Sequence, residues 1–141
     1  MKNKQTQILL VEDDQVDVAN VLRAFKAQGI ENLVQVAADG REALELLQQQ
    51  QAMAKPLPKI ILLDLNLPHM NGLEFLQEIR KDDHLKACSV FVMSSSTTEQ
   101  DLLAAYELNV AGYIQKPVLY ESFLEMVTTL NSYWNLIELP N

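Results

Sequence analysis

The sequence predicts an α/β fold in which helices cover both faces of a parallel β-sheet. Short apolar segments typical of strands alternate about five times with amphipathic segments typical of helices, which favours helical crossovers between parallel strands. The segment Ile60-Ile61-Leu62-Leu63 is an unbroken apolar run, the pattern of a strand buried on both faces of such a sheet. The crossovers are expected to be right-handed.

Five strands are expected, and each is followed by polar or turn-forming residues. They span Ile8–Val11, Leu33–Ala37, Ile60–Leu63, Ser89–Met93 and Ala111–Gln115. Helices are expected after Asp14, after Gly40, from about Gly72 to Arg80, after Thr98, and from about Tyr120 to Ile137. Asp14 is placed to cap the first helix and Gly29 to end it. The apolar face of that helix is expected to carry Val18, Val21, Leu22 and Phe25.

Length and composition indicate a single folded domain. The 141 residues are 48% hydrophobic and 21% charged, which suits one core. We expect one domain over residues 1–141, with a core over about residues 7–130 and a last helix reaching about residue 137. The formal net charge of −8 argues against nucleic-acid binding, which needs a basic surface, and suits a divalent cation or a basic partner.

No segment carries a signal for export or membrane insertion. The N-terminal apolar run is too short for a signal peptide, and no stretch is long enough to span a bilayer. The single cysteine, Cys88, cannot form an internal disulfide, and we expect it to be a small buried filler. These features predict a soluble cytoplasmic protein without membrane contact.

Charged and hydroxyl side chains stand where the expected strands end. Glu12 and Asp13 follow the first strand, Asp64 the third, Ser94 the fourth and Lys116 the fifth. The carboxyl ends of parallel strands meet at one edge, where α/β proteins bind ligands. Three clustered carboxylates repel one another, and a hard divalent cation relieves that repulsion. Mg2+ fits because it takes a few oxygen ligands from the protein and keeps waters, while the lysine balances the remaining charge.

Such a set of residues can accept a phosphoryl group. A carboxylate can attack phosphorus and form an aspartyl-phosphate, with Mg2+ neutralising charge on the transferring group. Lys116 and the Ser94 hydroxyl are expected to hold phosphoryl oxygens. Backbone N–H groups after Asp64 and near Ser95 can add to this cradle, so Asn66 and Ser95 are also candidates for phosphate binding.

Four motifs in collinear order resemble the receiver domain of two-component response regulators. They are Val11-Glu12-Asp13-Asp14, the segment DLNLPHMNG at residues 64–72, Ser94, and Lys116-Pro117. Each motif alone is a weak signal, but all of them at these spacings are a strong one, and the resemblance covers nearly the whole chain. It implies a flavodoxin-like sheet of five parallel strands in the order 2-1-3-4-5, with five helices.

The resemblance implies a role for each acidic residue. Asp64 would be the phosphoacceptor, and a sensor histidine kinase would be the donor. Asp13 and Asp64 would bind Mg2+ directly, the Asn66 carbonyl would be a third ligand, and Glu12 would act partly through water.

The resemblance also implies a switch. The Ser94 hydroxyl would move to the phosphate and the Tyr113 ring would turn inward behind it. The Lys116–Pro117 peptide bond would be cis, which X–Pro bonds permit at little cost. The chain would act as a single-domain response regulator that catalyses only its own phosphorylation and dephosphorylation, and signals by binding a downstream protein or by relaying phosphate.

The last helix carries more apolar residues than one face needs. A coiled-coil-like seam comprises Phe123, Val127, Leu130, Trp134 and Ile137, and further apolar residues are Met126, Tyr133 and Leu136. The seam is either core alone or also a homodimer interface. The ending, Tyr133-Trp134 and then Glu138-Leu139-Pro140, resembles stand-alone regulators of bacterial, including cyanobacterial, phytochrome kinases, which implies light signalling.

Simpler interpretations stay open for several residues. Asp64 could cap the next helix, Glu12 could interact with a helix dipole, and Lys116 could be solvated. Ser95 and Ser96 could belong to an ordinary polar loop, and Tyr113 could be a packing residue. His69 and His84 are interpreted as isolated, non-catalytic loop residues.

Two other functions compete with the response regulator. A Mg2+-dependent phosphatase with an aspartate nucleophile would use Asp64-Leu65-Asn66 as its Asp-x-Asp motif, but that motif usually follows the first strand. A receiver-like adaptor would never take phosphate, and intact Asp13, Asp64 and Lys116 argue against it.

Overall fold

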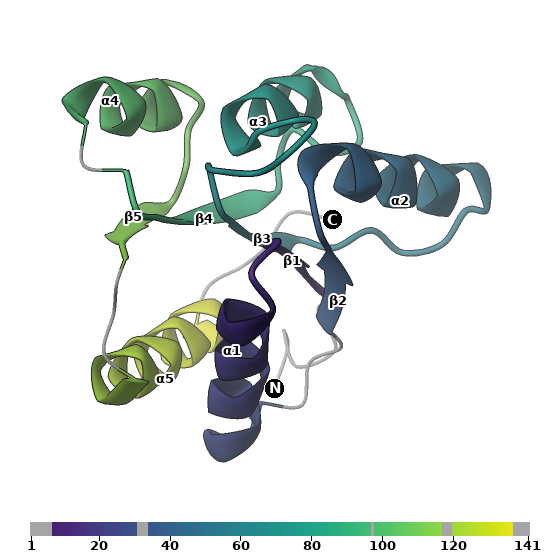
Figure 1. Cartoon of the computed structure of the whole chain (residues 1–141). Helices are drawn as coiled ribbons and strands as arrows, with labels where there is room; N and C mark the ends of the chain where they lie inside the picture. The colour runs from purple at the N-terminus through teal and green to yellow at the C-terminus, as the bar shows by residue number, and fades with distance from the viewer. Residues whose placement is uncertain (1–6, 31–33, 97, 117–119, 137–141) are drawn as a thin grey trace.

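The centre of the molecule is a parallel sheet. A computed structural model of the chain describes residues 7–30, 34–96, 98–116 and 120–136. Its strands are β1 (Ile8–Val11), β2 (Val34–Ala37), β3 (Ile60–Leu63), β4 (Ser89–Ser94) and β5 (Gly112–Gln115). All pairs are parallel and the order is β2-β1-β3-β4-β5, which confirms the expected order (Figure 1).

Helices cover both faces of this sheet. In the described part of the chain they are α1 (Gln15–Ala27), α2 (Gly40–Ala52), α3 (Gly72–Lys81), α4 (Glu99–Glu107) and α5 (Tyr120–Leu136). Figure 1 shows α2, α3 and α4 on one face and α1 and α5 on the other. None of these helices is long and apolar enough to cross a membrane.

Alternate residues of each central strand supply two separate cores. On β1, Leu9 and Val11 join the core beneath α2, α3 and α4, while Ile8 and Leu10 join the core beneath α1 and α5. All four of these side chains are fully buried. Successive residues of a strand point to opposite faces, so a strand with helices on both sides must be apolar throughout. The five expected strands are present, although Leu33, expected to begin the second strand, lies outside the described residues.

The strand register brings the carboxyl ends to a common edge. Val11 of β1 pairs with Leu63 of β3, and Leu63 pairs with Val92 of β4. Ser94, the last residue of β4, pairs with Gln115 of β5. The residues that leave β1, β3, β4 and β5 therefore reach the same edge of the sheet.

The start of α1 forms as expected, but its buried face differs. Asp14 caps the helix by accepting hydrogen bonds from the N–H groups of Val16 at 2.8 Å and Asp17 at 3.1 Å. Gly29 follows the helix with a φ of +70°. The prediction for Leu22 was wrong, because its side chain is 39% exposed and Ala24 is buried instead. The buried stripe of α1 therefore runs through Val18, Val21, Ala24 and Phe25.

Helix α5 packs on the sheet through the first half of its apolar seam. Phe123 and Val127 are buried, and Leu130 is partly buried against the same core. Tyr133 is half exposed, and its ring meets the ring of Phe91 edge to face at 6.4 Å between centroids. Leu136 is 84% exposed. The predicted seam residues Trp134, by its side chain, and Ile137 lie outside the part that the structure describes.

One arginine joins α3 to the loops that flank β4 and β5. Arg80 Nε donates to the carbonyl of Leu108 at 2.7 Å, and Nη2 donates to that of Asn109 at 3.1 Å. Its Nη1 donates to the carbonyls of Lys86 at 2.9 Å and Cys88 at 2.8 Å. The planar guanidinium suits such a set of acceptors because its donors are fixed in one plane.

Cys88 is buried beside this arginine, as expected for a small filler. Its Sγ lies 3.2 Å from the carbonyl oxygen of Pro58. Burial raises the pKa of the thiol to about 11, because the thiolate would lose its hydration.

Candidate functional site

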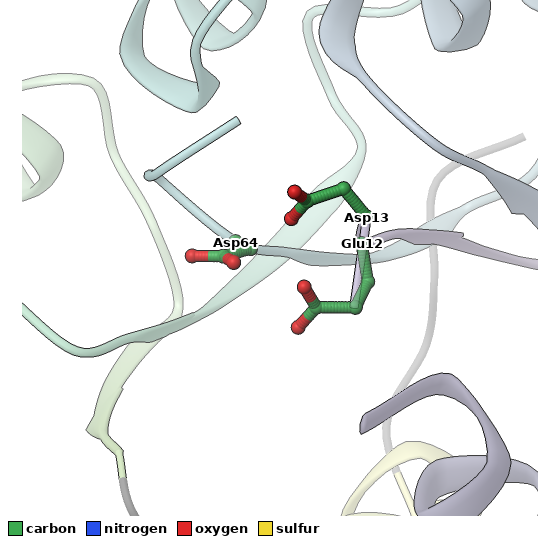
Figure 2. Close-up of side chains that lie close together, drawn as sticks. All are labelled: Glu12, Asp13 and Asp64. Carbon is green, nitrogen blue, oxygen red and sulfur yellow. The ribbon is translucent and has the colours of Figure 1, made fainter. Parts of the chain in front are cut away.

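Three carboxylates meet at the carboxyl ends of β1 and β3. Asp64 directly follows β3, and its N–H donates to the carbonyl of Val11 at 3.0 Å, which holds it beside the end of β1. Glu12 and Asp13 follow Val11, so the parallel register carries all three to one place. Figure 2 shows the three side chains grouped at this edge, and one oxygen from each lies within 4.8 Å of the others.

These carboxylates differ in their exposure to water. Glu12 is 1% exposed and Asp64 is 7% exposed, whereas Asp13 lies at the surface. Burial raises the pKa of Glu12 to about 7, and the hydrogen bond from Lys116 opposes this rise without cancelling it. The neighbouring charge of Asp64 raises the pKa further. Removal from water and mutual repulsion thus make the site favourable for a cation.

The donor chemistry fits a hard divalent cation. All three side chains offer carboxylate oxygens, which Mg2+ and Mn2+ accept, and the exposed side of Asp13 leaves room for waters. Glu12, Asp13 and Asp64 are therefore the residues that could hold such an ion.

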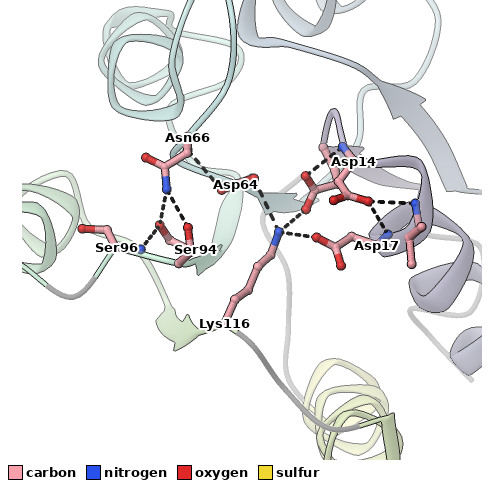
Figure 3. Close-up of polar contacts among 10 residues, drawn as sticks. Asp14, Asp17, Asp64, Asn66, Ser94, Ser96 and Lys116 are labelled. Carbon is pink, nitrogen blue, oxygen red and sulfur yellow. Dashed lines mark hydrogen bonds and ion pairs between the residues drawn. The ribbon is translucent and has the colours of Figure 1, made fainter.

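Lys116 enters the site from the end of β5. Its Nζ donates to Glu12 Oε1, to Asp17 Oδ2 at 2.9 Å and to Asp64 Oδ2 at 3.4 Å (Figure 3). Burial alone would lower the pKa of Lys116, but the hydrogen bonds to Glu12 and Asp17 and the charge of Asp64 outweigh burial and raise that pKa. Lys116 is therefore a charged partner of the acidic cluster and not a solvated lysine.

Asp17 is a member of this network that the sequence analysis missed. It lies in the first turn of α1, three residues after the capping Asp14, and its carboxylate contacts Lys116. An acidic residue in a first helical turn is usually explained by the helix dipole alone. The available signal was its spacing, because the first turn of α1 begins directly after the acidic residues that follow β1.

The hydroxyl side of the site is organised by Asn66. Its side-chain amide donates to Ser95 Oγ at 3.0 Å and to Ser94 Oγ at 3.5 Å, and its backbone N–H donates to Asp64 Oδ1 at 3.0 Å (Figure 3). Ser94 is fully buried and also accepts a hydrogen bond from the Ser96 N–H at 3.1 Å. Asn66 therefore links Asp64 to the candidates Ser94 and Ser95 at the end of β4.

A close backbone approach shapes the β3–α3 loop, residues 64–72. The N–H of Gly72 donates to the carbonyl of Leu65 at 3.0 Å. A Cβ atom at Gly72 would lie 2.4 Å from the carbonyl oxygen of Asp64 and 2.6 Å from Leu65 Cα, too close for any other residue. Glycine thus lets the loop fold back on itself and begin α3 directly behind Asp64.

Two further candidates lie at the border of the site. Tyr113 is partly buried against the core beneath α3 and α4, and its hydroxyl lies 3.5 Å from the carbonyl oxygen of Ser96. This position agrees both with packing and with a switch, so its role stays a prediction. Pro117, predicted to follow a cis bond, lies outside the described residues.

One histidine differs from the sequence interpretation. His69 was expected to be isolated, but its Nδ1 lies 2.7 Å from Asp39 Oδ2. The two residues come from different loops, so no spacing along the sequence would reveal the pair. His84 lies in an exposed loop, as expected.

Chemically, this edge of the sheet offers one carboxylate for modification. Asp64 belongs to a cluster of oxygens that can hold a cation, its carboxylate contacts the ammonium of Lys116, and Asn66 and the hydroxyl groups of Ser94 and Ser95 lie at the same edge of the sheet. Positive charge on both sides would stabilise a group carrying several negative oxygens at this position.

Comparisons with known proteins identify relatives along nearly the whole chain. The family model of the response regulator receiver domain matches residues 8–128. Response regulator Rcp1 of Synechocystis sp. is 38% identical over 133 residues, covering 94% of this chain and 90% of that protein. The probable methanogenesis regulatory protein FilR2 of Methanothrix harundinacea is 35% identical over 127 residues, covering 90% and 82%.

Solved structures agree with these relatives. The Mn(2+)-bound form of Rcp1 has a TM-score of 0.85 at 38% identity, covering 96% of this chain and 99% of that chain. The phosphorylated cyanobacterial phytochrome response regulator RcpA has a TM-score of 0.87 at 34% identity, covering 97% and 99%. The fold is accordingly flavodoxin-like. Together with the carboxylate cluster and Lys116 at the sheet edge, these matches establish that the chain belongs to the response regulator receiver domain family.

Proposed function

We propose that this chain is a phosphorylation switch that accepts a phosphoryl group on Asp64 from a sensor histidine kinase. One observation carries the proposal: the buried Asp64 carboxylate lies beside those of Glu12 and Asp13, and the ammonium of Lys116 contacts both Asp64 and Glu12. A carboxylate in that position can form a mixed anhydride with phosphorus while the surrounding charges stabilise the transferring group.

The site residues would divide the work. Glu12, Asp13 and Asp64, with the Asn66 carbonyl, would hold Mg2+, which neutralises charge on the phosphoryl group when bound. Lys116 would move its hydrogen bonds from the carboxylates to a phosphoryl oxygen. The hydroxyl of Ser94 and the amide side of Asn66 would hold the remaining oxygens. The chain would act on no substrate other than its own aspartate.

Phosphorylation would change the surface through Ser94 and Tyr113. The added charge would attract the Ser94 hydroxyl, which now accepts from the Ser96 N–H. The Ser96 carbonyl is the acceptor of the Tyr113 hydroxyl, so movement of this segment would release the ring. A shift in population between two states of the surface near α4 is the expected consequence.

The kinase partner could be a phytochrome, and the signal could be light. The likeness to Rcp1 and to RcpA, described as a phytochrome response regulator, supports this choice over other kinases. We also propose a cytoplasmic location.

Exposed Tyr133 and Leu136 on α5 support a second proposal, a homodimer formed through this helix. Leu136→Asp should then lower the sedimentation mass, and a wild type that sediments as a monomer would rule the dimer out.

The test of phosphorylation is an intact-mass measurement. The protein is incubated with Mg2+ and acetyl phosphate, and a gain of one phosphoryl group is expected in the wild type but not in Asp64→Asn. Chelation of the metal should abolish the gain. Wild-type protein that gains no mass would contradict the proposal. Turnover of a phosphoester by the purified protein would instead favour the phosphatase.

A further inference from the structure

The β3–α3 loop is joined to the start of α2 by one shared carboxylate. Asp39 Oδ2 lies 2.7 Å from His69 Nδ1, and Asp39 Oδ1 accepts a hydrogen bond from the N–H of Glu42 at 2.8 Å. The hydrogen bond from Glu42 and then the contact with His69 hold the pKa of Asp39 below its usual value. Asp39 is thus ionised, and it both caps α2 and holds the loop.

A backbone contact lies directly beside this pair. The N–H of Gly40 donates to the carbonyl of Met70 at 3.1 Å. A Cβ atom at Gly40 would lie 2.6 Å from the same carbonyl oxygen, so only glycine allows the two loops to approach this closely. Side-chain and main-chain contacts therefore fix residues 69 and 70 to the first turn of α2.

The backbone of His69 is in a conformation that other residues usually avoid. Its φ is +63°, where non-glycine residues are uncommon. Glycine would adopt this conformation without a steric penalty, and asparagine would tolerate it well. Histidine at this position adopts a less favourable backbone conformation, and its ring contacts Asp39. Glycine could not make that contact.

We propose that Asp39 and His69 are positioning residues for the metal site. The proposal rests on the function proposed above, in which the Asn66 carbonyl is a metal ligand. The ends of the loop are held by the N–H of Asp64 on Val11 and by the N–H of Gly72 on Leu65. The contacts of residues 69 and 70 with α2 fix the stretch between these ends, and with it the direction of the Asn66 carbonyl.

Mg2+ makes this positioning consequential. It requires near-octahedral ligands at short distances, so a carbonyl that wanders with a loose loop is a poor ligand. Groups outside the ligand set that orient the ligands typically change metal affinity by about 10- to 100-fold. His69 is separated from Asn66 by two residues, Leu67 and Pro68, so we expect an effect near the lower end of that range.

Because His69 has a positive φ, substitutions at this position can distinguish a positioning role from an ordinary contribution to stability. His69→Gly removes the ring but also relieves the backbone, so thermal stability without metal should change little. His69→Asn keeps a donor that can reach Asp39 in the same backbone conformation. Asp39→Asn keeps the cap of α2 but removes the charge. A positioning role predicts weaker metal binding at unchanged stability, with partial rescue by asparagine at position 69.

The experiment is a calorimetric titration of Mg2+ alone into the full chain. His69→Gly should raise the Kd about tenfold. Asp39→Asn should change it in the same direction, and His69→Asn should lie between His69→Gly and the wild type. His84→Asn is the matched control, because His84 is the other histidine of the chain, lies in an exposed loop away from this pair, and should leave the Kd unchanged.

Two results would overturn the proposal. One is an unchanged Kd in His69→Gly. The other is a parallel fall of affinity and thermal midpoint in both variants at position 69, which is the signature of a merely structural residue. In either case, wild type that binds Mg2+ and gains one phosphoryl group keeps the proposed function intact. Wild type that does neither removes the proposed function itself.

Discussion

Helices α3 and α4 cover the same face of the sheet (Figure 1), but they differ in how many of their side chains are buried against it. Helix α3 buries Phe75, Leu76 and Ile79 completely, and a capping box of Asn71 and Glu74 closes its start. Helix α4 buries Ala105 alone and leaves Leu103 55% exposed. The helix that follows β3 and Asp64 is therefore anchored, and the helix that follows Ser94 is loosely held.

This difference suits a switch. Local opening is easiest where few apolar contacts are lost, so α4 can change position at a small free-energy cost while α3 holds the site. The loose helix is not free at both ends, because Arg80 of α3 holds the carbonyls of Leu108 and Asn109 directly after it. Motion of α4 is therefore expected to be greatest at its start, next to Ser96 and Thr98.

The largest expected effect tests the anchored helix. Phe75→Ala should lower the free energy of unfolding by about 3–5 kcal/mol, because it removes a fully buried ring and leaves a cavity. Urea denaturation followed by circular dichroism measures this loss. A loss below about 1 kcal/mol would show that the core beneath α3 relaxes easily, and the contrast with α4 would fail.

A smaller effect tests the hydrogen bonds by which Arg80 of α3 holds the residues that follow α4. Arg80→Ala should lower the free energy of unfolding by about 2 kcal/mol, since four backbone carbonyls, two of them in part-buried hydrogen bonds, lose a charged donor. It should also speed hydrogen exchange at Asn109 and Ala111. Lys81→Ala is the control, because its contact with Glu78 at 3.8 Å is an exposed pair that contributes little. Equal effects of the two substitutions would mean that the hydrogen bonds of Arg80 do not hold the residues that follow α4.

Matched cap substitutions sharpen the contrast. Asn71→Ala at α3 and Thr98→Ala at α4 each remove one capping acceptor, which receives a hydrogen bond from the N–H of Glu74 at 2.9 Å and from the N–H of Asp101 at 3.2 Å, respectively. Each cap should contribute about 1 kcal/mol to its own helix. Loss of the α3 cap should lower the global free energy of unfolding by this full amount. Loss of the α4 cap should instead appear as faster local hydrogen exchange. Equal global losses would contradict this view.

The smallest expected effect lies on the exposed face of α4. Leu103→Ser should change the free energy of unfolding by no more than about 0.5 kcal/mol, as is usual for surface positions. Thermal denaturation measures it. A loss comparable to that of Phe75→Ala would show that α4 is as firmly packed as α3.

The fold could be predicted because the strands have recognisable local sequence patterns. A run such as Ile60–Leu63 leaves no polar face, and parallel pairing then forces the residues that follow the strands to a common edge. For the same reason Glu12, Asp13, Asp64, Ser94 and Lys116 could be named together before their contacts were known. Leu22 was misassigned because helical periodicity gives the apolar face but not its edges.

Contacts between loops were beyond this reasoning. Asp17 and Lys116 meet only after α1 has turned toward the end of β5, and Asp39 reaches His69 only because Gly40 lets two loops touch. Neither pair has a spacing along the chain that distinguishes it from surface charge. The weak attachment of α4 was also invisible, because Leu102, Leu103 and Tyr106 are as apolar as buried residues but remain exposed.

The burial of Cys88 would allow motion of α4 to be followed by spectroscopy. Reactive reagents attack the thiolate, and Cys88 is both enclosed and, with a pKa of about 11, almost fully protonated near neutral pH. A spin label or fluorophore offered to a chain that carries Leu103→Cys would therefore attach to α4 and spare the native sulfur. The tilt of that helix could be followed in otherwise unaltered protein.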